Sequence, residues 1–167
     1  MLIVGLTGGV ASGKSLVSQV WKEEGAYLID ADQIARELVQ PRKPAWREII
    51  RAFGEEILEE DGSIHRKRLA GKVFADAKQR KRLNRILHPR IKKEIDRRAK
   101  EIEQKDPEAI AVIDAPLLVE LGTHRQMDKL IVVTSTQTQQ IERLKDRDRT
   151  NTEEALRIVS SQMPLEE

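Results

Sequence analysis

Short apolar runs alternate along the chain with longer segments whose apolar residues recur at helical spacing. The run at 2–6 is almost wholly apolar, which is typical of a strand buried on both faces in the middle of a parallel sheet. A helical segment follows, and Gly25 stands where that helix is expected to end. A second strand is predicted at 26–30, so strand, helix and strand succeed one another and predict a βαβ unit.

The longest helical stretch lies between the second and third predicted strands. A helix is expected over 31–39, ending before Pro41, and the pattern from 45 to about 105 is helical throughout. Within this stretch Pro89 is expected to open a new helix, because proline is tolerated in a first turn. We interpret the stretch as an α-helical insertion.

The remaining elements complete the outline of an α/β domain. Apolar runs and helical spacing predict strands at 110–114 and 130–133 and helices at 137–148 and 153–161. Asn151 and Glu154 form a predicted cap pair for the last helix. The fold class is therefore α/β, a three-layer fold with a parallel sheet, in which a fifth strand would also be expected.

The composition removes several classes of site. The 167 residues include no cysteine, which excludes disulfides, thiolate zinc sites and cysteine nucleophiles. Three histidines are too few for a histidine-rich metal cage, and 3% aromatic residues argue against a nucleic-acid module that stacks bases. No apolar stretch is long enough to cross a membrane and no signal peptide precedes Met1, so a cytoplasmic protein is expected, with no membrane or nucleic-acid partner.

Charge is unevenly distributed, although the net charge is only +2. Between His65 and Lys100 there are fifteen Lys and Arg residues against three acidic residues. This stretch forms either solvated helix faces or a basic surface that faces a polyanionic ligand, for which phosphorylated small molecules are candidates.

The strongest motif lies between the first strand and the first helix. It matches G-x-x-x-x-G-K-[ST] in full with Gly8, Gly9, Val10, Ala11, Ser12, Gly13, Lys14 and Ser15. Glycines let the backbone turn its N–H groups around phosphate oxygens, and the helix N-terminus adds a favourable dipole. Lys14 would reach the β- and γ-phosphates, and the Ser15 hydroxyl would ligate Mg²⁺. The motif therefore predicts a phosphate-binding loop.

Carboxylates follow two of the predicted strands. Asp30 and Asp32 come directly after the second strand, and the carboxyl ends of parallel strands rim the ligand crevice in open α/β sheets. Asp32 would orient or deprotonate an acceptor hydroxyl, or would only cap the next helix. Asp114 ends the third strand, as a Walker-B acid does, and would hold a Mg²⁺-bound water or cap a turn.

Basic side chains further along are candidates for phosphate contacts. Arg143 and Arg147 are four residues apart and share a helix face. They would form a lid that neutralises charge in the transition state, or would lie on a solvated helix with Asp146 and Asp148 as partners. His88 would either cap the following helix or contact a substrate phosphate.

Taken in order, these residues resemble the dephospho-CoA kinase family. The resemblance runs from residue 2 to the end of the chain. It rests on the residues from Gly5 to Ser15, Asp30-Ala31-Asp32, Leu87-His88-Pro89, Pro116-Leu117-Leu118, Gln140 with Arg143 and Arg147, Arg157-Ile158 and Gln162-Met163-Pro164. The phosphate-loop motif alone is shared by many families, whereas the ordered set is much more specific.

The resemblance implies one P-loop nucleoside-triphosphate hydrolase fold over 1–167, with a core of 1–40 and 108–136. It also implies a helical CoA-binding insertion at about 41–107 and a helical lid at about 137–152. The implied reaction transfers the γ-phosphoryl group of ATP to the ribose 3′-hydroxyl of dephospho-CoA, the last step of coenzyme A synthesis. The alternatives are a nucleoside or nucleotide kinase of the same fold and a P-loop regulatory NTPase, although no N-K-x-D guanine motif is present.

The resemblance also implies roles for individual residues. Residues 8–16, including Leu16, would bind ATP, and Ser15 and Asp114 would hold Mg²⁺. Catalysis would involve Asp32, Lys14, Arg143 and Arg147. Dephospho-CoA would contact Asp32, His88, Pro116, Leu117 and Leu118.

The sequence departs from the family pattern in places. Ala11 stands where the family often has glycine, which is a mild change if the backbone φ at that position is negative. Leu16 replaces a frequent Thr, and Val119 replaces a common Phe. The family continues past residue 167 with a strand, a loop near the adenine and a final helix, so the natural protein is expected to be longer. Without that part the adenine pocket would be incomplete.

Overall fold

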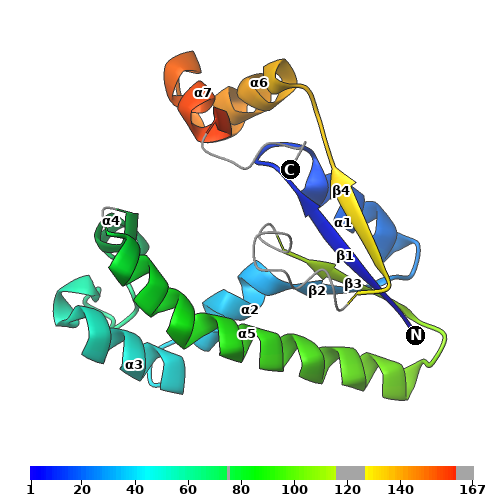
Figure 1. Cartoon of the computed structure of the whole chain (residues 1–167), viewed down its shortest axis with the longest axis horizontal. Coiled ribbons are helices and arrows are strands. Elements are labelled where there is room, and N and C mark those ends of the chain that lie inside the picture. Colours follow the sequence, from blue (N-terminus) through cyan, green and yellow to red (C-terminus); the bar gives the residue numbers. More distant parts are fainter. Residues whose placement is uncertain (75, 116–126, 161–167) are drawn as a thin grey trace. The chain divides into compact units, whose positions relative to one another are not determined.

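A computed structural model of the chain describes residues 1–74, 76–115 and 127–160 (Figure 1). The strands are β1 (Leu2–Gly8), β2 (Tyr27–Asp30), β3 (Ile110–Asp114) and β4 (Lys129–Val133). The helices are α1 (Lys14–Glu23), α2 (Ala31–Leu38), α3 (Pro44–Phe53), the 3₁₀ helix η1 (Glu55–Ile57), α4 (Arg66–Phe74), α5 (Ala77–Lys105), α6 (Gln137–Asp148) and α7 (Thr152–Ser160). By its contacts the chain divides into two compact units, a sheet unit of Met1–Ile29 with Ile102–Glu167 and a helical unit of Asp30–Glu101.

The sheet has four strands in the order β2-β3-β1-β4. β1 pairs in parallel with both of its neighbours, so that residues 2–6 stand opposite 110–114 and residues 4–8 stand opposite 129–133. The four central residues of β1 are buried, as expected for a strand in the middle of a parallel sheet. All four predicted strands are confirmed, and the carboxyl ends of β1 and β3 meet at one edge of the sheet.

The helix after β1 ends where the sequence predicts. The amide of Gly25 donates to the Lys22 carbonyl at 3.2 Å, and the amide of Ala26 donates to the Trp21 carbonyl at 2.9 Å. Gly25 has a φ of 93°, a left-handed conformation that glycine adopts without strain. The glycine therefore ends α1 and turns the chain into β2.

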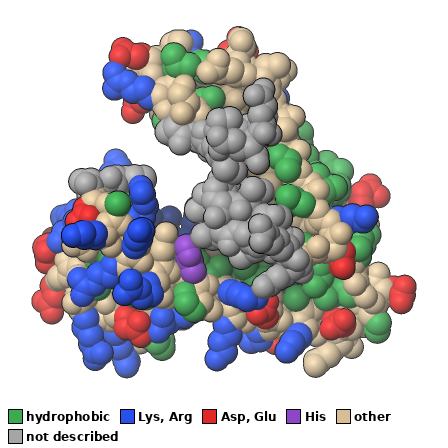
Figure 2. Space-filling view, in the orientation of Figure 1, with side chains coloured by type: hydrophobic (Ala, Val, Ile, Leu, Met, Phe, Trp, Pro, Cys, Tyr) green, Lys and Arg blue, Asp and Glu red, His purple; other side chains and the backbone are tan. Residues whose placement is uncertain are grey.

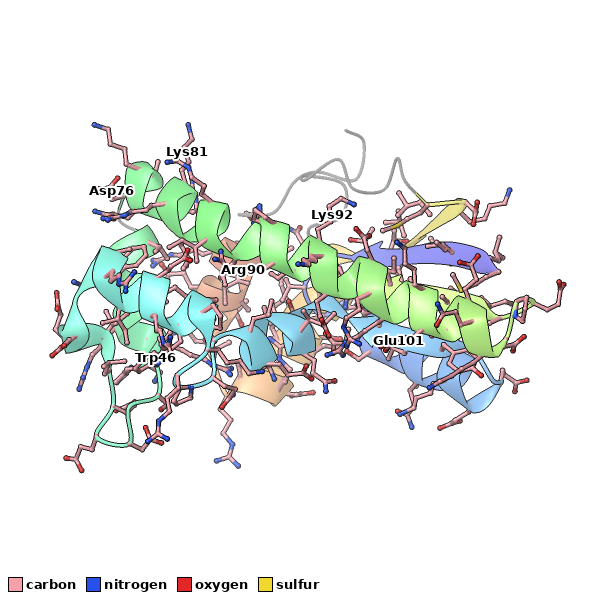
Figure 3. The ribbon with its side chains drawn as sticks, turned by 90° about the horizontal axis from the view of Figure 1, so that it is seen from below. Trp46, Asp76, Lys81, Arg90, Lys92 and Glu101 are labelled. Atoms are coloured by element: carbon pink, nitrogen blue, oxygen red, sulfur yellow. The ribbon has the colours of Figure 1, made fainter. Side chains whose placement is uncertain are left out.

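The helical unit has its core around Ile49, Phe53, Ile57 and Val73. The prediction of continuous helical structure from residue 45 is wrong between α3 and α4. Gly54, with a φ of 88°, ends α3, and an antiparallel bridge joins Leu58 to Ile64. The Trp46 indole nitrogen (Figure 3) donates to the Gly62 carbonyl at 2.9 Å and fixes this turn to α3. Two glycines with positive φ thus interrupt a pattern that is otherwise helical.

Pro89 does not open a helix, because it lies inside the 29-residue helix α5. A proline in a helix interior removes one backbone hydrogen bond, at a cost of about 3 kcal/mol. The segment before it packs against the core of the helical unit through Leu83, Ile86 and Leu87, and this burial favours one continuous helix. The Arg90 guanidinium also donates to the Ile86 carbonyl at 2.6 Å, so a side chain supports the backbone beside the proline. Figure 3 shows α5 continuing through Arg90 to Glu101.

Candidate phosphate-binding site

The loop between β1 and α1 is closed by its own backbone. The Ser12 amide donates to the Gly9 carbonyl at 3.1 Å, and the Leu16 amide donates to the Gly13 carbonyl at 3.0 Å as α1 begins. A Cβ atom at Gly8 would lie 2.5 Å from the Val133 carbonyl oxygen, so only glycine fits beside β4. Gly13 has a φ of 103°, which a larger residue would adopt only with strain. The two outer glycines of the motif are therefore required by the backbone itself.

Ala11 also has a left-handed backbone, with a φ of 54°. Alanine in place of the family's frequent glycine would be a mild change only at a negative φ, so the change is not mild at this position. For an L-residue with a Cβ atom this conformation costs roughly 1–2 kcal/mol. The loop therefore stores backbone strain at a position where glycine would be unstrained.

Lys14 and Asp114 form an ion pair at the edge of the sheet where β1 and β3 end. The Lys14 ammonium donates to a carboxylate oxygen of Asp114, and Asp114 is only 7% exposed. This pairing was not predicted from the sequence, which left Asp114 as a turn cap or a magnesium residue. The parallel register was the available signal, because it places Asp114 opposite Leu6, close to the start of the loop.

Side chains of helix α6 donate hydrogen bonds to the backbone carbonyls of the loop. The Gln140 side-chain amide donates to the Val10 carbonyl at 2.9 Å. The Arg143 guanidinium donates to the carbonyls of Ala11 and Ser12, both at 3.1 Å. The Gln140 contact was not predicted from the residues. Its spacing of three from Arg143, which places both side chains on one helix face, was the signal that could have found it.

Arg147 is paired within its own helix. Its guanidinium donates two hydrogen bonds of 2.7 Å to the carboxylate of Asp148. These bonds raise the pKa of Arg147 and lower the pKa of Asp148. The structure thus brings Arg143 to the loop and gives Arg147 the carboxylate partner that the solvated-helix interpretation expected.

The two carboxylates after β2 have different surroundings. The Asp30 carboxylate accepts from the Gln33 amide at 2.9 Å and is the N-cap of α2. Asp32 is exposed in the first turn of that helix, and no partner for its side chain is recorded in the described part of the chain. The interpretation of Asp32 as a cap is therefore wrong, because Asp30 makes the cap.

His88 lies in the middle of α5, so it is not a helix cap either. It is half-buried, and burial lowers its pKa, which keeps the imidazole neutral near pH 7. Lys81, Arg85, His88 and Lys92 follow one another at spacings of four, three and four residues, which places them on one helix face. Figure 3 shows Lys81 and Lys92 projecting to the same side of α5. We call these four residues the α5 stripe.

Several charges in the second half of α5 are paired with charges of the opposite sign within the helical unit. Arg98 pairs with Glu37 and also donates to Glu94 at 2.9 Å. Hydrogen bonds from Arg97 and Arg98 lower the pKa of Glu94 to about 2. In the stripe, Lys92 pairs with Asp96 at 3.3 Å. Lys81 and Arg85 are exposed, and the structure records no ion pair for either one among the described residues. Figure 2 shows Lys and Arg side chains gathered over the helical unit.

The family model for dephospho-CoA kinase, CoaE, matches residues 2–167. This chain belongs to the dephospho-CoA kinase family. It is 46% identical over 155 residues to the dephospho-CoA kinase of Moorella thermoacetica, and the aligned region covers 93% of this chain and 73% of that protein. It is 45% identical over 166 residues to the dephospho-CoA kinase of Corynebacterium glutamicum, and the aligned region covers 99% of this chain and 85% of that protein.

Two solved structures share the fold of this chain. A crystal structure from Thermus thermophilus matches with a TM-score of 0.86 at 27% identity, over 99% of this chain and 82% of that one. A dephospho-CoA kinase from Campylobacter jejuni matches with a TM-score of 0.67 at 24% identity, over 96% of this chain and 79% of that one, and supports the fold alone. The predicted three-layer α/β fold is therefore confirmed. Family membership makes the chain a kinase of coenzyme A biosynthesis that uses ATP and a small-molecule substrate.

Some predicted site residues of this dephospho-CoA kinase family member lie outside the described residues, namely Pro116, Leu117 and Leu118, as does Val119. Ser15 is exposed in the first turn of α1, and Leu16 beside it is 67% exposed. Over 1–74, 76–115 and 127–160 no group of three or more His, Cys, Asp or Glu side chains could hold a metal ion. No helix in those ranges is both long and apolar enough to span a bilayer.

Proposed function

We propose that this chain transfers the γ-phosphoryl group of ATP to the ribose 3′-hydroxyl of dephospho-CoA, which gives coenzyme A and ADP. The observation that carries the proposal is the phosphate loop at the carboxyl end of β1, with Lys14 at the first residue of α1. A helix N-terminus and a lysine together favour the anionic triphosphate. The family to which the chain belongs supplies the choice of acceptor.

In this proposal residues 8–16 bind the triphosphate of ATP. Lys14 exchanges its partner, Asp114, for the β- and γ-phosphate oxygens and stabilises the charge that develops in the transition state. Ser15 and Asp114 would hold Mg²⁺, because a hydroxyl and a carboxylate are the oxygen ligands that this ion prefers. When bound there, the ion would supply electrostatic stabilisation of the phosphates.

We assign the orientation of the acceptor hydroxyl to Asp32. Its carboxylate is exposed and is not used in the cap of α2, which Asp30 supplies. A carboxylate in this role accepts a hydrogen bond from the hydroxyl and takes its proton late in the transfer. Arg143 and Arg147 are assigned to the lid, where guanidinium groups would neutralise phosphate charge and help to exclude water.

We assign acceptor binding to the insertion at about 41–107, with His88 as one contact. The α5 stripe supports this proposal, because Lys81 and Arg85 present positive charge beside a neutral imidazole. Pro116, Leu117 and Leu118 are proposed to take part in the same binding. The core of 1–40 and 108–136, the lid at about 137–152 and a cytoplasmic location also stay predictions.

An acceptor assay tests the proposed function. Dephospho-CoA, AMP and nucleosides would be offered in parallel with ATP and Mg²⁺, and release of ADP would be followed. We expect dephospho-CoA to give the highest kcat/KM by a wide margin, with the product phosphorylated on the ribose. Higher turnover with AMP or a nucleoside would instead identify a nucleotide or nucleoside kinase of the same fold. Slow hydrolysis that ignores all acceptors would identify a regulatory NTPase.

Salt is expected to raise the KM for dephospho-CoA more than the KM for ATP. Screening weakens exposed charges such as those of Lys81 and Arg85, whereas the loop holds ATP at close range through backbone groups. Initial rates between low and physiological ionic strength would measure both constants. Lys81→Gln should flatten the dephospho-CoA slope, and Lys22→Gln, on the exposed side of α1, is the matched control. A dephospho-CoA KM that does not change with salt would favour a merely solvated surface.

A further inference from the structure

The carbonyl groups on the outer side of the phosphate loop need hydrogen-bond donors. A loop that turns its N–H groups toward a phosphate turns many of its carbonyl groups the other way. Three consecutive carbonyls, those of Val10, Ala11 and Ser12, accept hydrogen bonds from side chains of α6. One of these bonds comes from Gln140, a neutral side chain for which the proposed chemistry has no use.

Each peptide group is planar, with its carbonyl and its N–H on opposite sides. The carbonyl of Val10 belongs to the same peptide plane as the N–H of Ala11. The 2.9 Å hydrogen bond from Gln140 to that carbonyl therefore fixes the direction of the Ala11 amide as well. A bond accepted by the carbonyl also polarises the amide and makes its N–H a stronger donor.

The plane that Gln140 holds adjoins the strained residue of the loop. Ala11 has a φ of 54°, and such a conformation persists only where the surroundings fix it. Gln140 is suited to this task, because α6 is itself well anchored. Thr136 and Gln139 form a capping box at its start, and Leu144 is fully buried. The donor therefore comes from a rigid element.

We propose that Gln140 is a positioning residue, which aims the Ala11 amide at the phosphates of the nucleotide by holding the Val10 carbonyl from behind. Its effect is on nucleotide binding, not on the transfer step, because it contacts neither the reacting phosphoryl group nor the acceptor. Only the kinetic part of this inference rests on the proposed function.

Gln140→Met tests the inference, since methionine keeps the length and helix propensity of glutamine and loses its N–H donor. We expect the Kd of ADP, measured by calorimetry, and the KM of ATP to rise about fivefold, the size expected for one net hydrogen bond. The kcat and the KM of dephospho-CoA should stay within about twofold of wild type. Gln137→Met is the matched control, because Gln137 is exposed on the same helix.

A second variant separates the lost donor from damage to α6. Gln140→Lys keeps a donor on a side chain of similar reach, so its ADP Kd should lie closer to wild type than that of Gln140→Met. Equal weakening in both variants, an unchanged Kd in Gln140→Met, or a fall in kcat at constant KM would overturn the proposal. The ADP measurement needs no acceptor, so it stands apart from the dephospho-CoA assay of the wild type, which alone decides the proposed function.

Discussion

Lys14→Ala is expected to lower kcat/KM by about two orders of magnitude or more, the usual loss for one electrostatic contact in the transition state. The ammonium group is the only part of the side chain that the phosphates need, and alanine keeps the helix propensity at the start of α1. Coupled ADP release with dephospho-CoA measures the loss. Near-normal turnover in a folded Lys14→Ala protein would contradict the assignment of the phosphate loop.

The same substitution should also lower the melting temperature, because Asp114 is 7% exposed and would lose its cation. A charge that is left unpaired in a mostly buried place is destabilising. The double variant Lys14→Ala with Asp114→Ala separates the two effects. It should recover much of the lost melting temperature and none of the lost activity. If the double variant recovered activity, Lys14 would act through Asp114 and not through the nucleotide.

Asp32→Asn is expected to lower kcat by about two orders of magnitude, the lower end of the range for a positioned general base. Asparagine keeps the size of the side chain and removes the charge that attracts the acceptor proton. ATP binding and the melting temperature should change little, since Asp32 is exposed and makes no cap. Single-turnover phosphorylation of dephospho-CoA would measure the effect on transfer without product release.

Asp30→Ala is the control for this pair of carboxylates. It removes the bond to the Gln33 amide and should destabilise α2 by about 1 kcal/mol, with a smaller effect on kcat. The two variants thus separate a lost cap from a lost base. A normal kcat in Asp32→Asn would leave the acceptor hydroxyl without its proposed partner, and a low melting temperature in that variant would point to a structural role.

The elements that the sequence predicted well are those with a strong local signal. The apolar run of β1, the glycines of the loop and Gly25 each specify their structure within a few residues. Pro89 shows the limit of local rules, because packing of Leu83, Ile86 and Leu87 keeps α5 continuous through a proline. No pattern within α5 alone reveals how much apolar surface its neighbours offer.

The site was predictable in its residue types and not in its contacts. Lys14 and Asp114 are 100 residues apart in the chain, and Gln140 is 130 residues from Val10, so only the tertiary structure brings the members of each pair together. The sign of φ at Ala11 is likewise set by the loop and not by alanine, which disfavours it. These three features decide the electrostatics and the backbone of the loop, and each depends on tertiary structure.

The left-handed backbone of Ala11 has a consequence for the gene as well as for the loop. Every alanine codon becomes a glycine codon through a single base change, so one point mutation would relieve the strain at this position. Selection for heat tolerance would be expected to recover that change. Codons for valine and threonine are equally near, and their branched side chains would increase the strain, so those changes would be purged.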